Sequence, residues 1–201
     1  MFTIKNLIFD LDGTLIKLPV DWRAAYYKVR DETGKSFTSL IELYSETWNT
    51  KLYEKISHIV EEYELEAAKS FQILDNSDKL ILELSRKYRL GLVTLQGKNV
   101  ALKILSEMGI LEKFEVVITR NDAPARLLQL KKVINETNFD PRETLVVGDR
   151  DADVEAALKL GCWAVLVDRK GKAERYDEPE QRFFIVYSLQ KIPEIITAIE
   201  A

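Results

Sequence analysis

The stretch that most constrains this chain is residues 6–16, NLIFDLDGTLI, where an apolar run passes directly into two aspartates and a glycine. The run at residues 7–9 is typical of a short buried strand, so Asp10 and Asp12 are expected at its carboxyl end. In an open α/β sheet the ligand crevice lies outside the carboxyl ends of the strands. Two acids there indicate a metal and phosphate site, although Asp-x-Asp-Gly also occurs as ordinary turn chemistry. What the other strand ends supply decides between the two.

From residue 77 onward, helical patterns alternate with short runs that are apolar throughout. Such alternation predicts a parallel sheet covered by helices on both faces, which is an α/β, Rossmann-like architecture. The expected helices cover residues 77–88, 98–108, 125–136, 153–160 and 192–199. The expected strands after the first cover residues 89–94, 116–119, 144–148, 163–167 and 183–187, and a polar loop is expected at 168–182.

Residues 17–74 interrupt this alternation with helical patterns alone, over about residues 20–33, 39–59 and 61–71. The interval therefore predicts a small all-helical insertion after the first strand. The expected domains are an α/β core, residues 1–16 and 75–201, and a helical domain, residues 17–74.

Composition narrows the function classes. The 29 Lys and Arg are outnumbered by 33 Asp and Glu, and a net charge of −4 gives no electrostatic case for binding nucleic acid. Cys162 is the one cysteine, so neither an intramolecular disulfide nor a thiolate metal cage can form within the chain. With no charged leader and no apolar run long enough to span a bilayer, we expect a cytoplasmic protein that does not bind membranes.

Four expected strand ends carry notable chemistry. The first gives Asp10 and Asp12, the second Thr94, the third residues 119–122 (TRND), and the fourth residues 148–153 (GDRDAD). In a parallel sheet these ends share one edge, so the side chains can meet there. Carboxylates, a hydroxyl and a nearby cation are the groups that phosphoryl transfer needs, and Mg²⁺ takes oxygen ligands while keeping several waters.

At this point the chain resembles a known family. Residues 10–15 (DLDGTL) are similar to the first motif of the haloacid dehalogenase (HAD) superfamily, Thr94 after residues 90–93 to the second, and residues 148–153 to the fourth. The helical interval sits where relatives with a C1-type helical cap, such as phosphoglycolate phosphatases, carry that cap. The resemblance implies a Rossmann-like HAD core with the cap inserted after the first strand.

The resemblance also implies roles for four acids. Asp10 would be the nucleophile that attacks phosphorus, and Asp12 the general acid and base. Mg²⁺ would be held by the Asp10 carboxylate, the Asp12 backbone carbonyl and Asp149. Asp153 would bind the ion through water or support its ligands.

The resemblance assigns the phosphoryl group to the Thr94 hydroxyl and the Leu95 backbone amide. Relatives commonly have asparagine where this chain has Leu95, whose side chain cannot hydrogen-bond. The third motif usually offers a lysine after the strand, and here no lysine stands between Thr119 and Lys131. Arg126 is the first candidate to replace it because it falls near the start of the following helix, and a guanidinium would bind phosphoryl oxygens as a fork. The other candidates are Arg120, Lys131 and Lys132.

The expected activity is a Mg²⁺-dependent phosphatase that hydrolyses a small phosphorylated metabolite through an aspartyl-phosphate. A cap that closes over the crevice fits a small substrate because it excludes water. A phosphomutase would share every core residue. A signalling receiver also phosphorylates an aspartate but needs neither Asp12 nor a cap, and the altered third motif also leaves open a binding module that has lost turnover.

Overall fold

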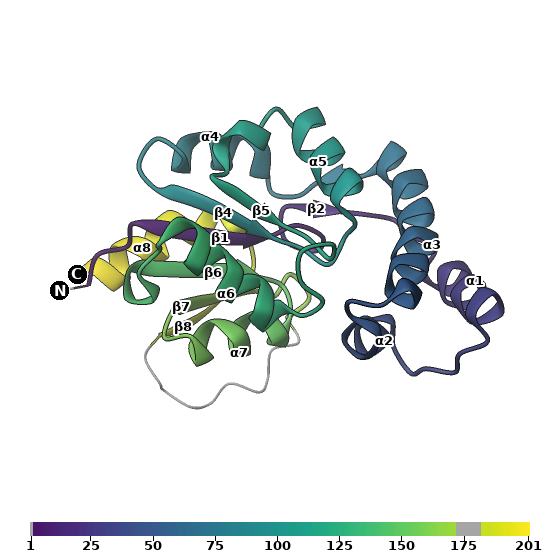
Figure 1. Cartoon of the computed structure of the whole chain (residues 1–201). Coiled ribbons are helices and arrows are strands. Elements are labelled where there is room, and N and C mark those ends of the chain that lie inside the picture. Colours follow the sequence, from purple (N-terminus) through teal and green to yellow (C-terminus); the bar gives the residue numbers. More distant parts are fainter. Residues whose placement is uncertain (1, 172–181) are drawn as a thin grey trace.

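The computed structural model of the protein describes residues 2–171 and 182–201, and a six-stranded sheet forms its centre (Figure 1). The strands of this sheet are β1 (Asn6–Asp10), β4 (Arg89–Val93), β5 (Val116–Ile118), β6 (Thr144–Gly148), β7 (Trp163–Val167) and β8 (Phe183–Val186). Their order is β5-β4-β1-β6-β7-β8, and each pairing is parallel. The predicted Rossmann-like α/β class is confirmed, with β1 at the centre of the sheet.

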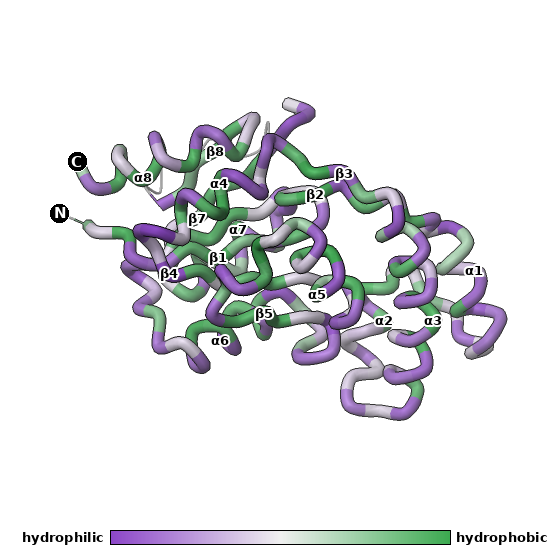
Figure 2. Tube along the Cα trace, turned by 90° about the horizontal axis from the view of Figure 1, so that it is seen from above, coloured by the Kyte–Doolittle hydropathy of each residue, from purple (hydrophilic) through white to green (hydrophobic). Residues whose placement is uncertain are grey.

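Helices cover both faces of the sheet, which explains why its strands are apolar throughout. These helices are α4 (Ser77–Leu84), α5 (Lys98–Glu107), α6 (Arg126–Thr137), α7 (Asp151–Lys159) and α8 (Ile192–Glu200). Leu7 and Phe9 belong to the apolar layer formed with α4, α5 and α8, whereas Ile8 belongs to the layer formed with α6 and α7. This is the period of two that a strand buried on both faces requires. Figure 2 shows the strands as a largely apolar centre surrounded by more polar helix surfaces and loops.

Three further helices lie beyond the carboxyl ends of the strands, and we call them the cap (Figure 1). They are α1 (Trp22–Thr33), α2 (Leu40–Thr47) and α3 (Lys51–Ala67). The cap has its own apolar cluster, in which Val29, Leu43 and Ile56 are almost fully buried. The helical character predicted for this interval is therefore what the structure shows.

The helix limits inside the cap differ from the prediction. The sequence pattern predicted one helix over residues 39–59 and another over 61–71, but the chain turns at Asn49 and α3 then runs unbroken to Ala67. Asn49 has a left-handed φ of 61°, and the Thr50 hydroxyl caps α3 by accepting from the Tyr53 amide at 3.2 Å. The prediction was wrong because apolar residues keep a helical spacing across the turn and hide it.

A two-stranded antiparallel ribbon connects the cap to the sheet, and the sequence pattern did not indicate it. Strand β2 (Ile16–Lys17) pairs with β3 (Gln72–Ile73), and the Leu15 carbonyl accepts from the Leu74 amide at 3.0 Å. Strands of two residues are too short for a periodic signal. The predicted domain limits fall within or beside this ribbon, and the division into two domains stays a prediction.

Two helices of the core also differ at their ends. The helix expected over residues 77–88 ends at Leu84, where the backbone tightens into i→i−3 hydrogen bonds such as Lys87 to Leu84 at 3.0 Å. Helix α7 starts at Asp151, two residues before the predicted start. Of the polar loop expected at 168–182, residues 172–181 lie outside the described residues. Within residues 2–171 and 182–201, every helix is too short or too polar to cross a bilayer.

The cap is fixed to the core where α3 meets the amino end of α5. The Gly97 amide donates to Glu64 at 3.0 Å, and the Asn99 amide donates to Glu61 at 3.1 Å. Both glutamates satisfy amides that a helix start leaves unpaired, and their charge opposes the positive end of the helix dipole. A Cβ at Gly97 would overlap the Glu61 carboxylate, so glycine permits this close approach.

A buried ion pair joins the same helix to the loop after β5. The Arg120 guanidinium donates to both carboxylate oxygens of Glu64 at 2.8 and 2.9 Å, and neither side chain is exposed. Arg120 also donates to the Ser57 hydroxyl at 3.0 Å and to the Leu95 carbonyl at 2.8 Å. Since Ser57 and Glu64 belong to the cap and Leu95 to the core, this one side chain holds three segments together.

We expect Arg120→Met to lower the free energy of unfolding by about 3–5 kcal/mol, because it leaves the Glu64 carboxylate buried without its partner. Burial already raises the pKa of Glu64 and Arg120 opposes that rise. Without Arg120 the folded protein favours protonated Glu64 even more, so the loss should be greater at pH 8 than at pH 5. Urea denaturation at the two pH values measures both effects.

The matched control is Glu107→Gln, which breaks the exposed Lys103–Glu107 pair and should cost less than about 1 kcal/mol. If Arg120→Met costs no more than this control, or loses the same stability at both pH values, the buried pair is not what anchors the cap.

Candidate active site

The two aspartates of the first motif lie at the carboxyl edge of the sheet, as predicted. Asp10 is the last residue of the central strand β1 and is 5% exposed. Asp12 is half-buried in the following turn, where its carboxylate accepts from the Leu18 amide at 2.8 Å. Gly13 makes this turn with a φ of 91°, and a Cβ there would overlap the Asp149 carboxylate. Glycine therefore lets the turn after β1 and the loop after β6 come together.

Arg126 lies between two of the site acids. Its guanidinium forms ion pairs with Asp10 and with Asp153, the latter with Nε and Oδ1 at 2.5 Å, and all three side chains are almost completely buried. Arg126 is the first residue of α6, which follows β5, and its charge reaches the end of β1 and the start of α7. The cation placed first from the sequence is thus the one that the structure brings to the acids.

The other candidate cations lie elsewhere. Arg120 is bound to Glu64 and faces the cap. Lys131 is exposed, and Lys132 pairs with Glu136 on its own helix at 3.1 Å. In the described part of the chain, none of these three forms an ion pair with the site acids.

A hydrogen-bonded chain continues from Arg126 to the end of β4. Arg126 donates to the Gln129 side-chain oxygen at 2.9 Å, and the Gln129 amide nitrogen donates to the Thr94 carbonyl at 2.7 Å. Gln129 is fully buried. Sequence reasoning missed Gln129, although its spacing of three residues from Arg126 places both on one face of α6.

Thr94 lies directly after β4 and is fully buried, and its hydroxyl donates to the side-chain oxygen of Gln96. The backbone N–H of Gln96 in turn donates to that hydroxyl at 3.2 Å. The structure gives no hydrogen bond from the backbone N–H of Leu95, which therefore lacks an acceptor among the described residues and is available to a ligand. Gln96 was not among the predicted site residues.

Asp149 and Asp153 lie in the loop after β6 and in the first turn of α7. Asp153 Oδ2 accepts from the Arg150 amide at 3.1 Å, which caps α7, while its other oxygen faces Arg126. A Cβ at Gly148 would overlap the Asp153 carboxylate, so glycine at this strand end makes room for the acid. Asp149 Oδ1 differs from both Asp153 oxygens, since it is buried and has no hydrogen-bond partner.

Arg169 is a further residue that the sequence did not indicate, because it lies in the polar loop after β7. Its guanidinium donates to the carbonyls of Gly13 at 2.6 Å and Thr14 at 2.9 Å, and it pairs with Asp75 at 2.7 Å. Asp75 stands directly after the ribbon that leads back from the cap. Arg169 therefore fixes the turn that carries Asp12.

The pKa values of Asp10, Asp12 and Asp149 are all raised above the ordinary value for aspartate. Burial raises the pKa of Asp10, with Asp153 and Asp149 adding to the rise and Arg126 opposing it. Burial also raises the pKa of Asp149 to about 6 and that of Asp12 above its ordinary range. The cations of the protein near this edge therefore do not fully neutralise the charge that its acids would carry.

A divalent cation would relieve this excess, and the donors present fit Mg²⁺. No three His, Cys, Asp or Glu side chains among the described residues gather as a complete cage. Mg²⁺ does not need one, because it keeps several waters and binds through one or two carboxylates. Asp149 Oδ1, buried without a partner, is the atom whose state a cation would best explain.

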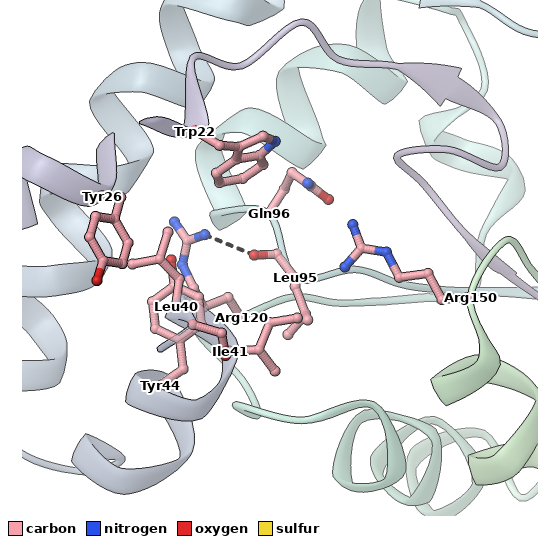
Figure 3. Close-up of a pocket in the computed structure, with 10 residues that line it drawn as sticks. Trp22, Tyr26, Leu40, Ile41, Tyr44, Leu95, Gln96, Arg120 and Arg150 are labelled. Atoms are coloured by element: carbon pink, nitrogen blue, oxygen red, sulfur yellow. Dashed lines mark hydrogen bonds between the residues drawn. The ribbon is translucent and has the colours of Figure 1, made fainter. Parts of the chain in front are cut away.

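A cavity of about 320 Å³ lies between the cap and this edge of the sheet (Figure 3). Trp22 and Tyr26 reach it from α1 and Ile41 from α2, while Leu95 and Arg150 border it from the core loops. A second hollow, of about 240 Å³, is lined by Arg126 and Asp153 and shares three of the same residues: Ile41, Leu95 and Arg150. The cavity under the cap thus continues toward the buried acids.

Comparison with known proteins agrees with this geometry. A phosphoglycolate phosphatase of Aquifex aeolicus is 25% identical over 182 residues, covering 81% of this chain and 84% of that protein. The pyrophosphatase PpaX of Bacillus mycoides is 24% identical and covers 98% of each chain. The structure of the HAD-type protein YfnB of Bacillus subtilis, solved bound to magnesium, superposes with a TM-score of 0.62 at 17% identity, covering 96% of this chain and 99% of that one.

The family model described as haloacid dehalogenase-like hydrolase matches residues 7–167. This span begins in β1, includes the cap, and ends with β7. It contains each site residue that the sequence pointed to, from Asp10 to Asp153. The protein belongs to the haloacid dehalogenase-like hydrolases.

Proposed function

We propose that this protein is a Mg²⁺-dependent phosphatase that hydrolyses small phosphate monoesters through an aspartyl-phosphate on Asp10. The observation that carries the proposal is the buried contact of Arg126 with Asp10 and Asp153 at the carboxyl edge of the sheet. It supplies a cation beside the nucleophile where relatives of the family use a lysine. The names of the two relatives, a phosphoglycolate phosphatase and a pyrophosphatase, support phosphorus chemistry of this kind.

In the proposed reaction an oxygen of Asp10 attacks phosphorus, and the bond from phosphorus to the ester oxygen breaks. Asp12, two residues along in the turn, protonates the leaving alkoxide, and its raised pKa favours the protonated form that this step needs. Asp12 then accepts a proton from the water that attacks the aspartyl-phosphate. Inorganic phosphate leaves, and Asp10 is restored as a carboxylate.

Arg126, Thr94 and the Leu95 amide would orient the phosphoryl group. Arg126 offers a fork of N–H groups next to Asp10, so charge that develops on the phosphoryl oxygens meets a donor that is already in place. Within residues 2–171 and 182–201, the Leu95 backbone amide has no other acceptor. Asp10, the Asp12 carbonyl and Asp149 would hold Mg²⁺, with Asp153 supporting them, and the ion would neutralise charge on the phosphoryl oxygens.

The first test is activity with p-nitrophenyl phosphate, measured as inorganic phosphate released so that hydrolysis is distinguished from transfer to another acceptor. Chelation should stop the release and added Mg²⁺ should restore it. Asp10→Asn should lower kcat by about 10³-fold or more, because an amide is a poor nucleophile. Asp31→Asn, on the exposed surface of α1, should leave the rate unchanged. Turnover that persists in chelator would contradict the metal assignment.

Asp12→Asn separates the two halves of the reaction. p-Nitrophenolate leaves without a proton, so the variant should still phosphorylate Asp10, whereas hydrolysis of the intermediate needs a base and should slow. Intact-protein mass spectrometry should therefore detect a phosphorylated form of this variant, and Asp10→Asn should abolish that form. A variant that turns over at the wild-type rate would show that Asp12 does not transfer the proton.

Arg126→Met should lower kcat/KM by about 10²–10³-fold, the cost of removing one preorganised donor from a developing negative charge. Arg126→Lys should recover part of the loss, because it restores the charge without the fork. Lys131→Met removes a cation from the exposed part of the same helix and should have no effect. Wild-type kcat/KM in Arg126→Met would contradict the role given to this residue.

A further inference from the structure

The cavity under the cap has mainly apolar walls. Trp22 and Tyr26 stand on one side, and Leu40 and Ile41 on another (Figure 3). Leu95 completes the wall from the loop that follows β4. The Tyr44 hydroxyl is buried in this wall without a hydrogen-bond partner among the described residues and could serve one polar group of a ligand. The rest of the lining is mainly apolar, so an apolar group bound here would remove these side chains from water.

The charges around the cavity are distributed unevenly. Arg120 borders it but is already neutralised by Glu64 and bonded to Leu95 and Ser57. The Tyr26 hydroxyl is likewise engaged, since it donates to the Phe37 carbonyl at 2.6 Å. Arg150 is exposed and forms no ion pair with any described residue, and it stands on the side of the cavity nearest Asp149. The positive charge thus lies toward the phosphoryl end, and the far end is apolar.

The size of the cavity excludes a close fit to a two-carbon leaving group. When empty, a cavity of about 320 Å³ has room for roughly ten waters, and glycolate or a second phosphate would displace only some of them from its apolar walls. Water held against apolar side chains is readily displaced by an apolar ligand group. A benzene-sized ring fills such a space and can pack edge-on or face-on against the aromatic walls from α1 and α2.

We propose that the substrates are phosphate monoesters of primary alcohols that carry an aromatic ring, with the ring bound in this cavity against Trp22, Ile41 and Leu95. The inference rests on the proposed phosphatase function and specifies its substrate class. It separates this protein from the activities that name its relatives, whose leaving groups are small and strongly polar.

The test compares alkyl phosphate esters, whose leaving alcohols have similar reactivity, and adds pyrophosphate, an anhydride with a better leaving group. 2-Phenylethyl phosphate should have a kcat/KM at least about tenfold above ethyl phosphate, 2-phosphoglycolate and glycerol 3-phosphate, and inorganic pyrophosphate should be poorer still. If kcat/KM for ethyl phosphate or 2-phosphoglycolate equals or exceeds that for 2-phenylethyl phosphate, the inference is overturned, while the phosphatase function still stands. Release from none of the compounds would overturn the phosphatase function itself.

A binding measurement tests the cavity without turnover. In calorimetry, benzylphosphonate should bind at least about tenfold more tightly than methylphosphonate. Its binding should also change the tryptophan fluorescence of the protein, and this change should be absent in Trp22→Phe. Equal affinities of the two phosphonates would overturn the inference whether or not the protein is active.

Ile41 and Leu82 give a matched pair of variants, since they are 42% and 38% exposed and only Ile41 borders the cavity. Ile41→Ala should lower kcat/KM for 2-phenylethyl phosphate about three- to tenfold more than it lowers kcat/KM for ethyl phosphate. Leu82→Ala, on the outer side of α4, should change neither value. If the ratio of the two kcat/KM values is unchanged in Ile41→Ala, the cavity does not bind the aromatic ring.

Discussion

Four acids converge on the carboxyl edge of the sheet, and the buried charge of Arg126 neutralises two of them, Asp10 and Asp153. Without it, Asp10 and Asp153 would face each other out of water, where like charges and desolvation both favour protonation. The guanidinium also extends through Gln129 to the carbonyl of Thr94, so one side chain connects the ends of β1 and β4 with the start of α7. The position of Asp10 therefore depends on the charges and hydrogen bonds along the whole edge.

A second buried arginine, Arg120, attaches the cap to the core. Arg120 and Glu64 form a pair with no exposure to solvent, and the pair also bonds the loop that follows Thr94. Because Glu61 and Glu64 also accept from amides at the start of α5, α3 is held firmly against the core. Helices α1 and α2 form the far wall of the cavity. A cap held in this way fixes the shape of the cavity more firmly than a hinged lid would.

The fold could be predicted from the sequence because apolar strands and helices alternate cleanly after residue 77, and the acids could be predicted because strand ends share one edge. The turn at Asn49 could not, since the apolar spacing continues across it. Arg120 and Arg126 both followed a strand end, and only the packing of Glu64 against one and Asp10 against the other distinguishes them. Gln129 and Arg169 act through bonds to backbone carbonyls, which leave no pattern in a sequence.

The place of β1 at the centre of the sheet bears on how the chain is made. Asn6–Asp10 emerges from the ribosome before every other strand, yet its partners are β4 and β6, which are separated from it by the cap and by most of the core. The cap helices are contiguous and can form from local contacts, whereas β1 stays an unpaired apolar segment until β4 is made and lacks its second neighbour until β6 follows. The strand that ends at Asp10 is thus translated before the five strands with which it shares a sheet, and its two neighbours come from separate later parts of the chain.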